Sequence, residues 1–221
     1  MDRSHIKGLG FAGKTMQTFA ALSFTQVVYF AVGIITARVL GPSEKGVLAI
    51  VNLYPMVLLT LLNLSIYRAV TVHVAEGKYP FSHFPVTLMA YGFVSTAIMV
   101  ALFAAAYYLE PRYFISQAPA WLVFAAMLMI PFVFIVSVFG SLLEVKNEVS
   151  LVNVKDIFNS LALLLSIVVG LLVLRARVSG AALAYVAAHA MTSAVVVGMV
   201  RRLDDAPWMF DGRLLRALVR D

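Results

Sequence analysis

The chain has 221 residues, of which 62% are hydrophobic and 13% charged, with a formal net charge of +6 and no cysteine. A soluble domain of this length could not bury so much apolar surface, so the composition excludes a soluble globular protein and predicts an integral membrane protein. The missing cysteines exclude disulfides and thiolate chemistry, and the positive charge suits cytoplasmic loops and membrane lipid headgroups, so it requires no nucleic acid.

Six charge-free stretches of 23, 22, 31, 31, 18 and 23 residues follow one another along the chain. About 20 helical residues cross a hydrocarbon core of about 30 Å. These stretches are apolar on all sides rather than alternating, which favours helices over a β-barrel. We therefore expect an all-α membrane protein, a six-transmembrane-helix bundle over residues 1–203, with helices at about 16–37, 47–67, 84–109, 119–143, 152–174 and 179–200.

Lysine and arginine are concentrated in alternate connections. The amino end, the second and fourth loops and the tail hold 12 of them, whereas the other three loops hold 5. Short cationic loops stay in the cytoplasm, so both termini are predicted to be cytoplasmic. The first apolar run is too long for a cleaved signal peptide, so we expect this helix to be retained.

Polar residues in the first two helices are candidate substrate contacts, because polar side chains inside a membrane tend to face a cavity or another helix. Gln26 lies on one side of the first helix, which is either a packing seam or a cavity wall. Asn52 and Asn63 are about three turns apart and so share one face of the second helix. Arg68, one turn further, is either a bidentate diphosphate ligand or an ordinary cytoplasmic anchor.

Two prolines fall within predicted spans, Pro55 in the second and Pro131 in the fourth. Proline removes a backbone donor and can kink a helix at a hinge. The kinks suit a bundle that changes shape, and static packing around proline is the alternative.

The sixth helix carries two stripes at four-residue spacing. One is a small-residue face that lets a neighbouring helix approach closely. The other is polar, and its His189 is a further candidate substrate contact. This histidine is either a proton relay or a neutral, hydrogen-bonded packing residue. The small stripe is Gly180, Ala184, Ala188 and Thr192, and the polar stripe is Tyr185, His189 and Ser193.

Residues 204–221 form a distinct tail that begins with a turn-like Asp-Asp-Ala-Pro segment. Its leucines and arginines separate onto two helical sides, which is typical of a basic helix lying in the headgroup plane. A solvated loop or a linker between two lobes is the alternative. The leucines are Leu214, Leu215 and Leu218, and the arginines Arg213, Arg216 and Arg220.

Catalytic patterns are missing from the sequence. Ser179 and His189 are about 15 Å apart along one helix, too far for a nucleophile to meet its base. No P-loop, HExxH motif or clustered metal ligands occur. We therefore expect no enzyme activity, no cofactor and no metal site.

The segment ARVLGPSEKG joins the first two predicted helices and resembles a signature of the polysaccharide (O-antigen type) flippases. These belong to the multidrug, oligosaccharidyl-lipid and polysaccharide exporter superfamily. Three later segments are similar to the family in matching order: Asn63–Lys78, Asn153–Asp156 and Ser179–His189. The residues that match the signature are Ala37, Arg38, Leu40, Gly41, Pro42 and Gly46.

The resemblance implies a carrier that moves an undecaprenyl-diphosphate-linked glycan across a bacterial inner membrane by alternating access between two six-helix lobes. This chain resembles the amino-terminal lobe of such a twelve-helix exporter, and its tail is similar to the linker between lobes. The second lobe would come from another chain or, in a homodimer, from a second copy. The alternative function is a non-transporting scaffold subunit of a polysaccharide-assembly complex.

Overall fold

A computed structural model describes residues 11–63, 66–109, 118–204 and 206–220 of the chain. Three of the cations used to predict orientation, Arg3, Lys7 and Arg112, lie outside these residues. In chain order the elements are α1 (Phe11–Asn63), α2 (Ile66–Glu76), the short 3₁₀ turn η2 (Phe81–His83), α3 (Phe84–Leu109), α4 (Ala120–Met127), α5 (Met129–Val145), α6 (Val149–Val168), the π-helical turn η4 (Val169–Val173), α7 (Arg177–Arg201) and α8 (Gly212–Arg220).

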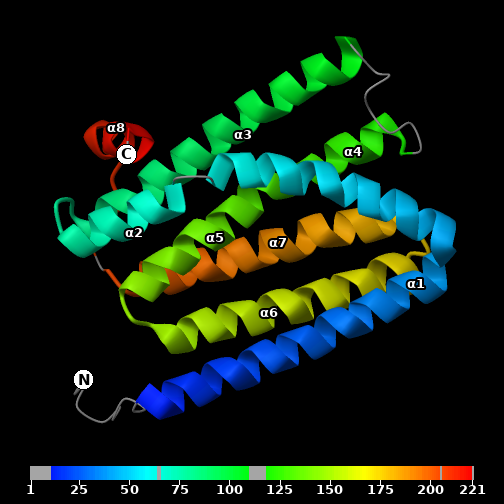
Figure 1. Cartoon of the computed structure of the whole chain (residues 1–221), viewed down its shortest axis with the longest axis horizontal. Coiled ribbons are helices and arrows are strands. Elements are labelled where there is room, and N and C mark those ends of the chain that lie inside the picture. The colour runs from blue at the N-terminus through cyan, green and yellow to red at the C-terminus, as the bar shows by residue number, and fades with distance from the viewer. Residues whose placement is uncertain (1–10, 64–65, 110–117, 205, 221) are drawn as a thin grey trace.

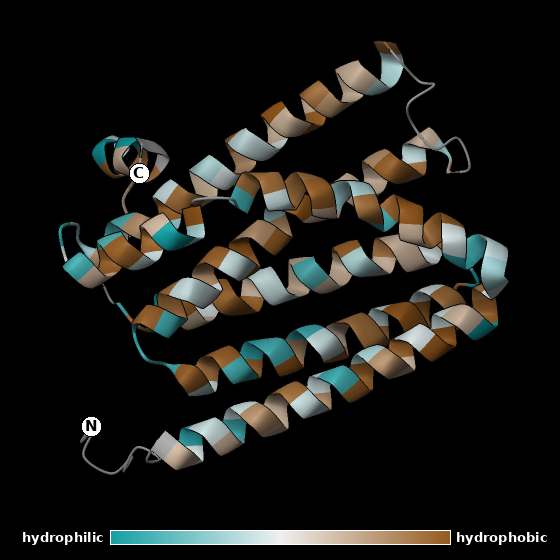
Figure 2. Cartoon of the chain, viewed as in Figure 1, coloured by the Kyte–Doolittle hydropathy of each residue, from teal (hydrophilic) through white to brown (hydrophobic). Residues whose placement is uncertain are grey.

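The described residues form helices and short connections with no β-strand, which confirms the predicted all-α class. Apolar residues cover most of the long helices (Figure 2). The predicted count of six spans is not confirmed, because the first two predicted helices are joined in one long, bent helix. The stretches long and apolar enough to cross a membrane are Ala12–Glu76, Phe81–Leu109, Ala120–Val145, Val149–Val173 and Arg177–Arg201.

The bend in α1 occurs at Gly41, which has a φ of 72° and a ψ of 176°. A positive φ suits glycine, and the fixed φ of Pro42 suits the first turn of a new helix. Residues 11–40 therefore form a first arm and residues 42–63 a second arm that runs back along the bundle (Figure 1). The connection predicted at 38–46 was too long, because a single residue makes the bend.

Proline also explains the division of the fourth predicted helix into α4 and α5. The boundary lies at Leu128, between Met127 and Met129. Pro131 has no N–H to donate to the carbonyl of Met127, so the helical hydrogen-bond ladder is interrupted there. Pro55 leaves the helical dihedral angles of the second arm intact.

α7 lies at the centre of the bundle, between α5 and α6, and the first arm of α1 packs on the other side of α6 (Figure 1). η4, which continues α6, meets α7 backbone to backbone at Gly170 and Gly180. A Cβ atom at Gly180 would lie 2.6 Å from the carbonyl oxygen of Gly170. Ala184, Ala188 and Thr192 are also buried. The small-residue stripe is therefore used for packing within the chain.

The tail folds back onto the bundle, where α8 lies against α2 and α3 (Figure 1). Leu214 and Leu218 are fully buried, so these leucines face the protein. Asp211 Oδ1 caps α8 by accepting hydrogen bonds from the N–H groups of Arg213 and Leu214. Asp211 Oδ2 lies 3.0 Å from His83 Nδ1. The hydrogen bond with His83 and those from the backbone hold the pKa of the Asp211 carboxyl below its ordinary value.

Candidate functional site: a polar cavity between the arms of α1

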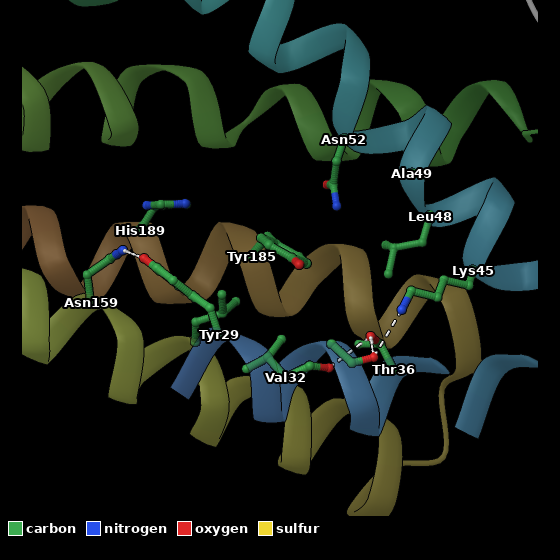
Figure 3. A pocket seen from close by; sticks show the side chains of 12 residues that line it. Tyr29, Val32, Thr36, Lys45, Leu48, Ala49, Asn52, Asn159, Tyr185 and His189 are labelled. Carbon is green, nitrogen blue, oxygen red and sulfur yellow. Dashed lines mark hydrogen bonds between the residues drawn. The ribbon is translucent and has the colours of Figure 1, made fainter. Parts of the chain in front are cut away.

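A cavity of about 460 Å³ lies between the two arms of α1, with α6 and α7 completing its walls (Figure 3). This volume is in the range of about 300–1,000 Å³ that is usual for small-molecule sites. Its lining mixes polar side chains with apolar ones, whereas the surface of the long helices is mostly apolar. The lining residues are Tyr29, Val32, Gly33, Thr36, Lys45, Leu48, Ala49, Asn52, Asn159, Leu163, Tyr185 and His189.

One wall of the cavity is held together by the amide of Asn159 on α6. Its Nδ2 donates to the hydroxyl of Tyr29 over 3.0 Å, a contact drawn in Figure 3. Its Oδ1 accepts a hydrogen bond of 3.0 Å from the hydroxyl of Thr192 on α7. Because both ends of the amide are engaged, Asn159 fixes the first arm, α6 and α7 relative to one another.

The end of the cavity near Gly41 is closed by contacts around the bend. Lys45, on the second arm, donates from Nζ to the carbonyl oxygen of Gly33 on the first arm, over 3.0 Å. Next to Lys45, Glu44 forms an ion pair with Arg177 at the start of α7. These contacts tie the two arms to each other and to α7.

Two polar atoms at the cavity wall are buried and have no hydrogen-bond partner among the described residues. They are Asn52 Oδ1 on the second arm and His189 Nδ1 on α7. An unsatisfied buried polar atom costs about 1–3 kcal/mol. Both side chains point into the space between the arms (Figure 3). The cavity therefore has hydrogen-bonding capacity that the fold does not use.

The structure brings together only two of the five residues predicted from the sequence to contact substrate, Asn52 and His189. Gln26 and Arg68 are exposed and do not line the cavity. Asn63 has a buried unpartnered Oδ1, but it lies about 16 Å further along the helix than Asn52. Asn63 shares a helical face with Asn52, but it does not lie at the same site.

Sequence reasoning missed four polar residues of the cavity, namely Tyr29, Thr36, Lys45 and Asn159. Lys45 was counted only as a loop cation, although its ammonium group reaches back along the helix. Tyr29 and Asn159 lie in apolar runs, and only the rarity of an amide in such a run points to the second of them. Pro55 lies close to the cavity on the second arm, whereas Pro131 lies on α5 and is not part of the lining.

The arrangement suits reversible binding of a polar group, because its side chains offer hydrogen bonds and no carboxylate lines the cavity. Among the residues that the structure describes, no group of three or more histidine, aspartate or glutamate side chains could hold a metal ion. Comparisons with protein families, with curated proteins and with solved structures found no match to this chain.

Proposed function

We propose that this chain is one lobe of an alternating-access flippase for lipid-linked oligosaccharide or polysaccharide precursors. It works in a bacterial inner membrane with both termini in the cytoplasm, and it binds and moves its substrate without chemical change. The observation that carries this proposal is the polar cavity, with its unused hydrogen-bonding groups, inside a bundle of apolar helices.

The cost of polar groups in a membrane supports this function. A hydrophilic glycan crosses hydrocarbon only where protein groups replace its water, and such groups are expensive to keep when they have no partner. The side chains of Asn52 and His189 meet this description. The similarity of residues 37–46 to the flippase signature gives the substrate class, an undecaprenyl-diphosphate-linked glycan.

Alternating access requires a second lobe that covers the opening between the arms of α1. Ala184 and Ala188 are buried within the chain, so the small-residue stripe offers little surface to a second copy. A homodimer would need another self-complementary face. This supports a second lobe that is not another copy of this segment, from a separate chain or from the rest of a larger transporter.

Inside-out membrane vesicles test the function with any partner chain in place. Vesicles from cells with and without the chain would receive undecaprenyl-diphosphate-linked N-acetylglucosamine, and an impermeant glycosyltransferase would report the sugar left on the outer face. We expect the sugar to become protected only when the chain is present. Equal protection in both vesicle types would contradict the proposal.

A double replacement, Asn52→Leu with His189→Leu, separates transport from the scaffold alternative. A transporter should lose protection of the sugar at an unchanged level of protein, because the polar wall is gone. A non-transporting scaffold subunit should leave the sugar unprotected in vesicles with or without these two side chains, and polysaccharide export in cells should be the same for both forms.

A further inference from the structure

The free polar groups of the cavity share one property, which is that each can both donate and accept hydrogen bonds. Asn52 contributes a carboxamide and His189 an imidazole, and both have a buried atom without a partner. Tyr29 and Tyr185 contribute phenolic hydroxyls. The hydroxyl of Tyr29 already accepts a hydrogen bond from Asn159, so its own proton is left for another acceptor.

Positive charge, in contrast, is scarce in the cavity. Among the described residues that line it, Lys45 is the only lysine or arginine, and one of its N–H groups is engaged by the carbonyl of Gly33. Lys45 also lies at the end nearest the bend, away from His189 (Figure 3). A cluster of guanidinium groups, the usual partner of phosphate, does not line this space.

A lipid-linked glycan has a sugar end and a diphosphate end. The donor and acceptor groups of the cavity and its scarce positive charge show which end it suits. Diphosphate oxygens at neutral pH only accept hydrogen bonds and require concentrated positive charge. Sugar hydroxyls both donate and accept, which matches an amide, an imidazole and two phenols. The tyrosine rings add apolar surface beside polar groups, which suits the mixed faces of a pyranose ring.

We propose that this cavity binds the sugar end of the substrate, an uncharged, hydroxyl-bearing pyranose, and that the diphosphate stays outside it. The lipid linkage of the substrate rests on the proposed function. Recognition of the sugar rests on the cavity alone, and it applies equally to a free saccharide.

Saturation-transfer NMR on the full chain in lipid nanodiscs tests this assignment, with N-acetylglucosamine as the sugar probe and inorganic pyrophosphate as the competitor. We expect saturable sugar binding that pyrophosphate does not displace. Asn52→Leu and His189→Leu should each weaken sugar binding by about tenfold, the loss expected for one hydrogen bond.

Asn63→Leu is the matched control, because Asn63 lies on the same arm and also has a buried unpartnered oxygen, but is outside the cavity. It should bind the sugar as the unmodified chain does. Displacement by pyrophosphate, or equal sugar binding by the Asn52→Leu and Asn63→Leu variants, would overturn the assignment.

The vesicle and nanodisc experiments fail independently. Sugar binding that depends on Asn52, in a chain that does not move lipid-linked sugar, would reject the flippase function and keep the sugar site. Movement of lipid-linked sugar that is unchanged by Asn52→Leu and His189→Leu would keep the flippase function and reject the sugar site.

Discussion

The polar side chains between the first arm of α1 and α6 differ from two on the other walls of the cavity. Along α6, polar side chains are paired. On the second arm and on α7, Asn52 Oδ1 and His189 Nδ1 have no hydrogen-bond partner among the described residues. The pairs along α6 are Gln17 with Ser150 at 3.2 Å, Thr18 with Asn153 at 3.3 Å and Tyr29 with Asn159 at 3.0 Å.

The difference separates polar groups that hold the bundle together from those that are free to bind a ligand. Lipid chains cannot hydrogen-bond, so a polar side chain in a membrane bundle is stabilising only if another protein group satisfies it. The α6 contacts meet that condition. Asn52 Oδ1 and His189 Nδ1 do not, and their cost is consistent with selection for binding rather than for stability.

The largest expected effect on stability comes from the contact between Gly170 in η4 and Gly180 in α7, where the backbones leave no room for a side chain. This contact holds two walls of the cavity in place. In Gly180→Ala, the added methyl group would meet backbone atoms of Gly170, which cannot move aside cheaply. We expect a loss of about 1–3 kcal/mol, as for overpacking in other cores. Unfolding by a denaturing detergent, followed by circular dichroism, measures it.

Gly198→Ala on the same helix is the control for that replacement. A Cβ atom there would meet nothing within 4 Å. Alanine favours a helix over glycine, so this variant should be as stable as the unmodified chain or slightly more stable. If Gly180→Ala were as stable as Gly198→Ala, the backbones at Gly170 and Gly180 would be further apart than described.

A smaller effect is expected from Asn159→Ala, which tests the paired side of the comparison. This change removes the hydrogen bonds to Tyr29 and Thr192. Interhelical hydrogen bonds in membrane proteins average about 0.6 kcal/mol, so we expect a loss of about 1 kcal/mol in the same unfolding experiment. Ser150→Ala, which removes one exposed bond to Gln17, should lose less. A neutral Asn159→Ala would mean that the pairs do not hold the bundle.

The sequence predicted a helix boundary well where an apolar run defines the helix. It predicted a boundary less well where the backbone of a glycine or proline defines it. α3 begins and ends where predicted, at Phe84 and Leu109, because an uninterrupted apolar run defines it. The bend in α1 and the division between α4 and α5 depend on Gly41 and Pro131. Both residues were noted in the sequence, but whether a proline breaks a helix depends on its packing, as the intact helix at Pro55 shows.

The cavity was harder to predict, because it depends on which helix faces are neighbours. The polar stripe of the sixth predicted helix contains His189, which lines the cavity. Ser193 belongs to the same stripe, yet it is buried and donates to the carbonyl of Ala190. Periodicity groups residues on one helix, but it does not reveal that Asn159 and Tyr29 meet across two helices.

The smallest expected change in stability comes from Asn52→Leu. Its sign is the sharpest test of the difference between paired polar side chains along α6 and unpartnered ones at the cavity. Leucine has nearly the shape of asparagine and no polar atom. Replacing an unsatisfied buried amide removes a desolvation cost, so the variant should be as stable as the unmodified chain or more stable, by up to about 1 kcal/mol.

Asn159→Leu, with the same change in chemistry at a satisfied amide, should be destabilised. Both are measured by detergent unfolding in the absence of sugar. If Asn52→Leu instead loses about as much stability as Asn159→Leu, then the Asn52 amide is satisfied in the membrane, and the cavity has no unused capacity there for a ligand.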